Sequence, residues 1–331
     1  MRTTLRHLAI YTAVCLMPAL SMADALPSWN EGVVKSAIVD FVSDVTDSGS
    51  DQFVPQNSRI AVFDNDGTLW SEKPFYFQFL FAMERLAVLA EADPSILTSD
   101  VLKAAARGDL NGALAEGEHG LLEIVNASHS GMSVEEFQFQ ARNWLATARH
   151  PETGRTYTDM VYQPMLELLS FLRDNGFKTY IVSGGGVDLL RTFAESVYGI
   201  SPYQVIGSMG DASYTIADGN PSITKEPGIF FINDKGGKPV AIMRHIGMRP
   251  IFAAGNSDGD FQMLEWSTAG NGPRFGLIVH HTDADREWSY DRDSAVGRLQ
   301  RGLDEGPDRG WTIVDMKRDW YRIFPSVPAS E

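Results

Sequence analysis

Two aspartates lie two positions apart in the segment FDNDGTLW, residues 63–70, directly after an apolar run with the character of a buried strand. Two carboxylates this close together repel each other unless a cation is bound between them. Carboxylate oxygens suit Mg²⁺, which proteins usually hold with one or two carboxylates, water and a substrate phosphate. Asp64 and Asp66 therefore predict a metal-assisted phosphate site, and an ordinary Asx turn around Gly67 is the alternative.

Polar residues also follow two later apolar runs. The groups at the three run ends are Asp64 and Asp66 after the first, Ser183 with Gly184, Gly185 and Gly186 after the second, and Asn256, Asp258 and Asp260 after a later one. Ligands of parallel α/β sheets bind beyond the carboxyl ends of the strands. The sequence therefore predicts that the three groups converge on one site, where the glycine-rich turn offers backbone N–H groups to an anion.

The surrounding pattern is that of an α/β protein. The strand-like runs are RIAVFD, KTYIVSGGG, RPIFAAG, FGLIVHH and WTIVDM, and helical segments alternate with them. This alternation predicts a Rossmann-like, doubly wound, largely parallel sheet. Short alternating pieces with turn signals in residues 205–239 predict a β-hairpin or flap.

Residues 75–172 interrupt this alternation with long amphipathic segments, in which apolar residues recur every three or four positions. Ser133 and Glu136 form a capping-box pattern at the start of one of them. The block falls between the first and second predicted strands. We therefore predict a core of residues 24–74 and 173–331 that carries an inserted helical domain of residues 75–172.

The first 23 residues have the layout of a secretory signal peptide, with Arg2 and Arg6, an apolar run over residues 8–20, and small residues at Ser21 and Ala23. The apolar run is shorter than the roughly 20 residues that a membrane anchor needs. Cleavage after Ala23 would remove the one cysteine of the chain, and the product would tolerate an oxidising compartment. We expect a periplasmic or secreted protein with no membrane partner after cleavage.

The composition narrows the class of partner. The 331 residues include 43 Asp and Glu against 28 Lys and Arg, a net charge of −15, and cleavage would remove two of the arginines. A surface with this surplus of negative charge disfavours nucleic acid and anionic membranes as partners. We expect a small-molecule partner, and the sequence leaves the oligomeric state open.

Four of these features resemble, in order and context, the motifs of the haloacid dehalogenase superfamily. They are FDNDGT, the serine of IVSGGG, a lysine that opens a short helix, and GNSDGDFQML. The chain looks most like the phosphoserine phosphatase-like phosphomonoesterases, which carry a helical cap of the C1 type between the first two motifs. The resemblance implies that residues 75–172 form this cap. It also implies Mg²⁺-dependent hydrolysis of a small phosphomonoester through an aspartyl phosphate.

The resemblance gives each matching residue a role. Asp64 would be the nucleophile, and Asp66 would protonate the leaving alcohol and then activate water. A carboxylate at the second position implies phosphoryl transfer rather than dehalogenation. Ser183 and the backbone at Gly184 and Gly185, together with Thr68 of the first motif, would bind the phosphoryl group.

A lysine of the third motif would neutralise developing charge and restrain Asp64. Three lysines compete for this role, namely Lys225, Lys235 and Lys238. Lys238 opens the predicted helix KPVAIMRHIG just before the last motif strand, which matches the family placement. Lys235 is the second choice, and Lys225 fits the flap better.

The fourth motif departs from the family pattern GDGxNDxxML. Asn256 stands where a metal-binding aspartate is usual, and Asp260 aligns with the second acid. We expect Asp64, the carbonyl of Asp66 and Asn256 to bind Mg²⁺, with Asp260 close behind. Because an amide oxygen brings no charge, the metal affinity is expected to be lower and other divalent ions can serve, unless Asp258 compensates.

Two alternatives stay open. Glu72 either reads a substrate amine, as a residue near this place does in related enzymes, or is a solvated acid at a helix start. The same chemistry would also serve a phosphotransferase, and Asn256 permits a phosphate-ester binding protein without turnover. The presence of Asp64, Asp66 and Ser183 with a lysine favours catalysis.

Overall fold

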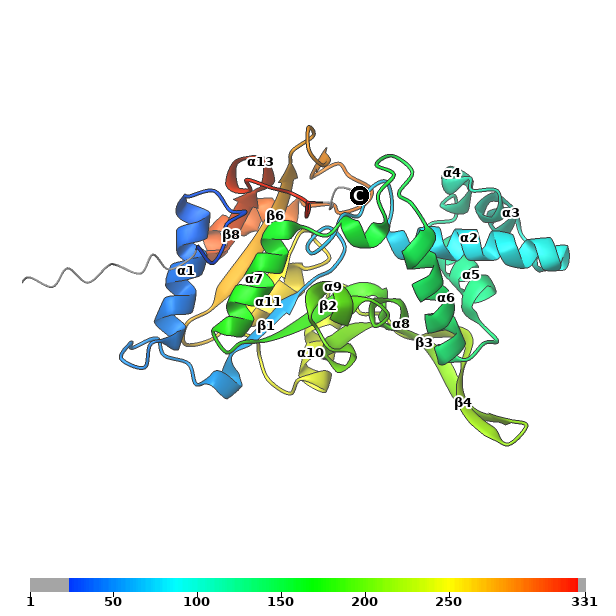
Figure 1. Ribbon diagram of the computed structural model, residues 1–331, viewed down its shortest axis with the longest axis horizontal. Helices are drawn as coiled ribbons and strands as arrows, with labels where there is room; N and C mark the ends of the chain where they lie inside the picture. Colours follow the sequence, from blue (N-terminus) through cyan, green and yellow to red (C-terminus); the bar gives the residue numbers. More distant parts are fainter. Residues whose placement is uncertain (1–23, 327–331) are drawn as a thin grey trace, which may run out of the picture.

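The computed structural model describes residues 24–326, so the predicted signal peptide, residues 1–23, lies outside the described residues. The strands are β1 (Ile60–Phe63), β2 (Lys178–Gly186), β3 (Val205–Ala217), β4 (Asn220–Phe231), β5 (Phe252–Gly255), β6 (Phe275–Thr282), β7 (Ser289–Tyr290) and β8 (Thr312–Asp315). Within residues 24–326, no helix is long and apolar enough to cross a membrane. Figure 1 shows a body built on the sheet, with helices and a long hairpin extending from one side.

The α-helices follow the same alternation along the chain. They are α1 (Val33–Thr46), α2 (Phe77–Ala92), α3 (Asp100–Ala106), α4 (Leu110–Ala113), α5 (Glu118–His129), α6 (Val134–Thr147), α7 (Gln163–Asp174), α8 (Val187–Leu190), α9 (Ala194–Tyr198), α10 (Gly237–His245), α11 (Phe261–Thr268), α12 (Arg301–Glu305) and α13 (Met316–Asp319). Short 3-10 turns connect several of them.

The sheet is parallel through its centre. Its order is β4-β3-β2-β1-β5-β6-β7, and β8 pairs with β6 in parallel. β4 and β7 are antiparallel to their neighbours. The carboxyl ends of β1, β2 and β5 therefore meet at the same edge of the sheet, as the sequence predicted.

Helices cover both faces, because the side chains of the central strand alternate between two cores. Ile60 and Val62 of β1 belong to the core shared with α10 and α11, while Ala61 and Phe63 belong to the core shared with α1, α7 and α9. All four side chains are fully buried, as expected for a strand apolar on both faces. The prediction of a doubly wound α/β fold is confirmed.

The helical insert has its own apolar cluster, formed by α2 to α5, with Phe79 and Met83 of α2 against Val101 and Leu102 of α3. α6 packs instead against α8 and β4. α7 falls inside the predicted cap range of 75–172, yet it packs against β2 and belongs to the core beneath the sheet. The helices that stand apart from the parallel strands are therefore α2 to α6 (Figure 1).

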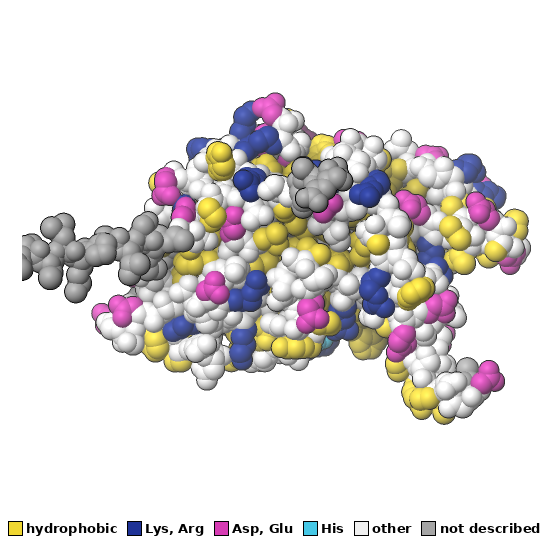
Figure 2. Space-filling model, in the orientation of Figure 1, with side chains coloured by type: hydrophobic (Ala, Val, Ile, Leu, Met, Phe, Trp, Pro, Cys, Tyr) yellow, Lys and Arg dark blue, Asp and Glu magenta, His cyan; other side chains and the backbone are white. Residues whose placement is uncertain are grey.

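The predicted hairpin is present as β3 and β4, and it is tied to the helical insert. Gly131 donates its N–H to the carbonyl of Lys225 at 2.8 Å, and Lys225 donates to the carbonyl of Met132 at 2.9 Å. Ser133 caps α6 by accepting the N–H of Glu136. Figure 2 shows hydrophobic side chains gathered at the far end of the hairpin, where Tyr214, Ile216 and Ile223 are exposed.

Candidate active site

A tight turn follows β1 and fixes the two aspartates of the first motif. Asp64 donates its N–H to the carbonyl of Ala254 at 2.9 Å, which extends the pairing with β5 by one residue. The carbonyl of Asn65 accepts the N–H groups of Thr68 and Leu69, and Gly67 has a φ of +73°. Glycine adopts this left-handed backbone conformation without strain. The turn therefore places Asp64 and Asp66 at the carboxyl end of the central strand.

Lys238 joins two of the predicted acids. Its ammonium lies 2.7 Å from Oδ1 of Asp64 and 2.5 Å from Oδ1 of Asp260, and all three side chains are buried. Burial lowers the pKa of Lys238, but the charges of Asp260 and Asp64 outweigh it and raise the pKa above its ordinary value. Lys238 is therefore a charged, fixed group in contact with the predicted nucleophile.

Asp260 has both carboxylate oxygens occupied. Besides Lys238, it accepts the backbone N–H groups of Asn256 at 3.0 Å and Ser257 at 3.1 Å through Oδ2. It is fully buried at the start of α11. Asp260 therefore anchors Lys238 and the loop after β5 to each other.

Asp66 lies between Trp70 and the serine of the second motif. Its Oδ1 accepts the indole N–H of Trp70 at 2.8 Å, and its Oδ2 lies 3.5 Å from the hydroxyl of Ser183. The Trp70 ring is stacked on Phe193, so it holds this oxygen in a fixed direction. One carboxylate oxygen of Asp66 is thus restrained, and the other faces the serine.

The glycine-rich turn contacts a residue of the helical insert. The hydroxyl of Ser183 accepts the N–H of Gly185 at 3.0 Å, and Gln78 of α2 accepts the N–H of Gly186 at 2.5 Å. A Cβ at position 185 would lie 3.6 Å from Asp66 Oδ2, so this turn is next to the acidic loop. Gln78 was not predicted as a site residue, and an isolated glutamine in an aromatic run gives no signal of such a contact.

Asn256 reaches the acidic loop from the end of β5. Its Oδ1 accepts the hydroxyl of Thr68 at 3.1 Å, and its Nδ2 donates to Oε1 of Glu72 at 2.8 Å. Thr68 and Glu72, both predicted to bind substrate, are buried and contact Asn256. Glu72 also accepts the hydroxyl of Tyr290, a β7 residue that the sequence did not single out.

The remaining candidates lie elsewhere. Lys225 is paired with Asp188 at 2.5 Å between α8 and the hairpin, and the side chain of Lys235 is exposed. Asp258 accepts the N–H groups of Gln300 and Gly302 and so stabilises the segment that contains them. Its carboxylate therefore does not compensate for the missing charge of Asn256. Of the three competing lysines, Lys238 is the one that contacts Asp64.

Burial and crowding raise the carboxyl pKa values of this site. Burial first, then the charge of Asp260, raise the pKa of Asp64 well above its ordinary value, although Lys238 opposes them. Burial also raises the pKa of Asp66, and it raises that of Glu72 to about 7. Three carboxylates, those of Asp64, Asp66 and Asp260, therefore lie around the buried ammonium of Lys238, and a fourth, that of Glu72, lies against Asn256.

This surplus of negative charge fits a divalent cation. The available donors are carboxylate, carbonyl and amide oxygens, which are the hard ligands that Mg²⁺ prefers. Asp64, the backbone carbonyl of Asp66 and Oδ1 of Asn256 belong to the same two adjoining loops. The residues present are thus compatible with the predicted cofactor.

In metal-free protein, the raised pKa values predict that stability falls as the pH rises. The folded protein holds these protons more tightly than the unfolded chain, so for Glu72 stability is lost between a pKa of 4.5 and about 7. That shift corresponds to on the order of 3 kcal/mol. With chelator present, we expect a lower unfolding temperature at about pH 8 than at about pH 5, and a larger Mg²⁺-induced rise at the higher pH. Equal Mg²⁺ effects at both pH values would contradict this expectation.

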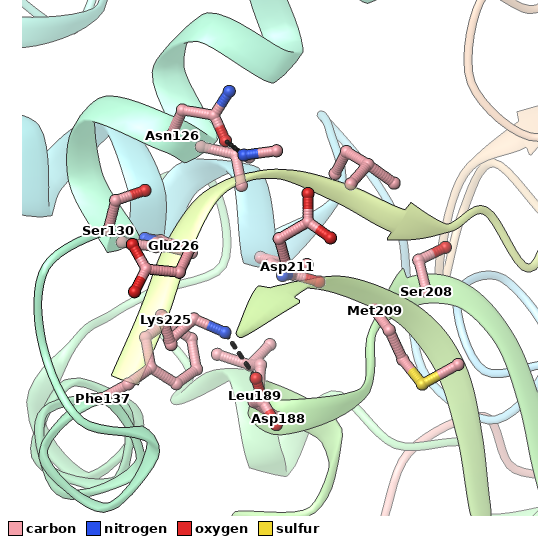
Figure 3. A pocket seen from close by; sticks show the side chains of 16 residues that line it. Asn126, Ser130, Phe137, Asp188, Leu189, Ser208, Met209, Asp211, Lys225 and Glu226 are labelled. Atoms are coloured by element: carbon pink, nitrogen blue, oxygen red, sulfur yellow. Dashed lines mark hydrogen bonds and ion pairs between the residues drawn. The ribbon is translucent and has the colours of Figure 1, made fainter. Parts of the chain in front are cut away.

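A cavity lies beside the glycine-rich turn, between α5, α6, α8 and the hairpin. Figure 3 shows Asp188 and Lys225 paired on one side of it and Asp211 between the two strands. Gln78 and Ser208 line the cavity and also contact the turn. Gln78 accepts the N–H of Gly186, and Ser208 donates its hydroxyl to the carbonyl of Gly184 at 2.7 Å. The cavity therefore adjoins the predicted phosphate site.

Comparisons with known proteins agree with this architecture. Residues 61–265, more than half of the chain, match the family model of haloacid dehalogenase-like hydrolases. No curated protein matches the chain. A solved structure of a conserved, functionally unknown protein from Anaerococcus prevotii DSM 20548 is similar at 17% identity, with a TM-score of 0.50, over 76% of this chain and 86% of that one.

Two further solved structures are similar at lower TM-scores. A protein of unknown function from Bordetella pertussis Tohama I is 17% identical, with a TM-score of 0.46, over 78% of this chain and 98% of that one. A phosphoserine phosphohydrolase-like protein from Francisella tularensis subsp. tularensis SCHU S4 is 15% identical, with a TM-score of 0.40, over 76% of this chain and 98% of that one.

Proposed function

The chain belongs to the haloacid dehalogenase-like hydrolase family, and from this membership we propose that it is an exported, Mg²⁺-dependent phosphatase that hydrolyses a small phosphomonoester through an aspartyl phosphate. One observation carries the proposal. Lys238 holds Asp64 and Asp260 together at the carboxyl ends of β1 and β5, and Asp66 faces Ser183 beside them. This set provides a nucleophile, a proton carrier and a phosphate site in one place.

Asp64 is the proposed nucleophile. Lys238 binds its Oδ1, which leaves Oδ2 to attack phosphorus. The bond from Oδ2 to phosphorus forms as the bond from phosphorus to the ester oxygen breaks. The buried ammonium offsets charge on the phosphoryl oxygens during this exchange and fixes the direction of the attacking carboxylate.

Asp66 is the proposed general acid and base. Its raised pKa favours the protonated form, which can deliver a proton to the leaving alkoxide. The resulting carboxylate then accepts a proton from water as the water oxygen attacks phosphorus and breaks the acyl phosphate bond. The second step releases phosphate and restores Asp64 as a carboxylate and Asp66 as an acid.

We propose that Ser183 and the glycine-rich turn bind the phosphoryl oxygens. The Ser183 hydroxyl is beside Asp66, and the glycine-rich turn lies next to it at the same edge of the sheet. Asp64, the Asp66 carbonyl and Asn256 would hold Mg²⁺. When bound, the cation supplies positive charge for the phosphoryl oxygens.

The organic part of the substrate is proposed to occupy the cavity beside the turn. The cavity is lined by Asp188, Asp211 and Glu226 against Lys225, so it favours a neutral or positively charged group. Helices of the insert and strands of the hairpin form its walls. We therefore propose that the helical insert and the hairpin determine which substrate is accepted.

Export is proposed from the first 23 residues, whose two arginines, apolar run and small residues match a signal peptide. A mature protein that begins at residue 24, identified by mass spectrometry outside the cytoplasm, would support this. A retained leader would contradict it.

The function is tested by hydrolysis of an aryl phosphate by purified residues 24–331 with Mg²⁺, with Mn²⁺ and with chelator. We expect turnover that falls at least about 100-fold in chelator and returns with the metal. An alcohol added to the same reaction distinguishes a phosphotransferase, which would form a new phosphate ester. Binding of phosphate esters without turnover under any divalent ion would contradict catalysis and favour a binding protein.

A further inference from the structure

The side chain of Asn256 is held at both ends of its amide group. Thr68 donates its hydroxyl to the amide oxygen at 3.1 Å, and the amide nitrogen donates to Oε1 of Glu72 at 2.8 Å. All three side chains are at most 2% exposed. The orientation of the amide is therefore fixed, with its oxygen toward Thr68 and its nitrogen toward Glu72.

Two glycines from distant segments leave room for this pair. A Cβ at Gly67 would lie 2.0 Å from Nδ2 of Asn256 and 2.5 Å from Oε1 of Glu72. A Cβ at Gly297 would lie 1.9 Å from the same Glu72 oxygen. Any larger residue at either position would displace the carboxylate. The backbone on both sides is thus shaped around the contact between Glu72 and Asn256.

Glu72 is itself held in place from β6 and β7. Tyr290 donates its hydroxyl to Oε1 of Glu72 at 2.7 Å. The Tyr290 ring stacks on His281 at 4.3 Å between centroids, and Nε2 of His281 lies 2.8 Å from the carbonyl of Gly67. The carboxylate is therefore restrained against the amide nitrogen of Asn256.

We propose that Glu72 is a positioning residue that turns Asn256 into an effective metal ligand. The Glu72 carboxylate accepts a hydrogen bond from the amide N–H of Asn256. This bond polarises the amide group and increases the negative charge on Oδ1 of Asn256. Glu72 thereby provides the negative charge that an aspartate would carry at position 256. It provides this charge through its contact with Asn256 and does not bind the metal itself. Groups that orient and polarise ligands in this way typically contribute 10–100-fold to metal affinity. The inference rests on the proposed function for the presence of Mg²⁺.

A charge swap tests the pair. Glu72→Gln removes the negative charge and leaves at most a neutral amide oxygen to accept the Asn256 N–H, and we expect the Mg²⁺ dissociation constant to rise about 10–100-fold. Asn256→Asp alone sets two buried carboxylates against each other, so it is also expected to weaken binding. In the double variant, the introduced glutamine can donate to the introduced carboxylate, and we expect affinity within a few-fold of the wild type or tighter.

The readout is calorimetric titration of residues 24–331 with Mg²⁺ alone, in the absence of substrate. Glu167→Gln is the matched control, because Glu167 is a hydrogen-bonded carboxylate on α7 that contacts Ser28 rather than the site, and it should leave the affinity unchanged. Thermal unfolding is measured for each variant. If Glu72→Gln does not fold, Asn256→Asp and the double variant still carry the test, since they differ at position 72 alone.

Two results would overturn the inference while leaving the proposed function intact. One is a wild-type affinity retained by Glu72→Gln. The other is a double variant that binds Mg²⁺ no better than Asn256→Asp. A wild-type protein that binds no divalent cation would instead overturn the proposed metal and, with it, the role of Glu72.

Discussion

Asp64→Asn is expected to reduce phosphomonoester turnover by about four orders of magnitude or more while leaving the protein folded. The amide cannot form the acyl phosphate, so the first chemical step is lost. Burial and the charge of Asp260 raise the pKa of the Asp64 carboxyl, which means that its charge is unfavourable in the metal-free fold. An uncharged amide should therefore leave the unfolding temperature unchanged or raise it.

This combination of effects separates a chemical role from a structural one. The measurement is the turnover number with saturating aryl phosphate and Mg²⁺, together with thermal unfolding in chelator. Asp258→Asn is the matched control, because Asp258 belongs to the fourth motif but accepts N–H groups of Gln300 and Gly302 away from the acidic loop. Turnover of Asp64→Asn within about tenfold of the wild type would exclude Asp64 as the nucleophile.

Lys238→Met is expected to give the largest loss of stability. Lys238 is 2% exposed, and its removal leaves Asp64 and Asp260 buried without a partner. Breaking a buried pair by removing one member typically costs about 3–5 kcal/mol of unfolding free energy. Turnover should fall as well, because the ammonium that directs Asp64 is gone.

Urea unfolding at neutral pH with chelator measures this loss, and Lys235→Met is its control. Lys235 is exposed and lies three residues away, so its substitution should change the unfolding free energy by no more than about 0.5 kcal/mol. Saturating Mg²⁺ should recover part of the stability of Lys238→Met, since the cation can offset the surplus carboxylate charge. Equal unfolding free energies for the two variants would contradict the assigned role of Lys238.

The convergence of the motifs could be predicted because its determinants are local in the sequence. The apolar runs before Asp64, Ser183 and Asn256 specify buried parallel strands, and the carboxyl ends of such strands meet at one edge. The position of Lys238 at a helix start also distinguished it from its two competitors. These inferences needed only strand patterns and the order of elements.

The partners of Asn256 could not be predicted in the same way. Tyr290 is 218 residues from Glu72 and lies in the two-residue strand β7, which is too short to have a recognisable pattern. The direction of Asp258 is fixed by backbone N–H groups more than 40 residues further along the chain. Such contacts depend on tertiary packing, so no local spacing indicates them.

The end of the helical insert shows a related limit. α7 is amphipathic like the helices before it, and the sequence pattern therefore grouped it with them in residues 75–172. In the structure its apolar residues Leu168, Leu169 and Leu172 pack beneath the sheet. Periodicity identifies an apolar face but not the surface that the face will cover.

The central claim is that Asp64 becomes phosphorylated during turnover. Its most direct test is acid quenching of residues 24–331 within the first turnover of a phosphomonoester, followed by mass spectrometry of the peptide that contains residues 60–72. We expect a phosphoryl group on Asp64 that disappears on longer incubation and is absent from Asp64→Asn. Steady turnover with no phosphoryl group on this peptide, or with the group on Ser183, would contradict it.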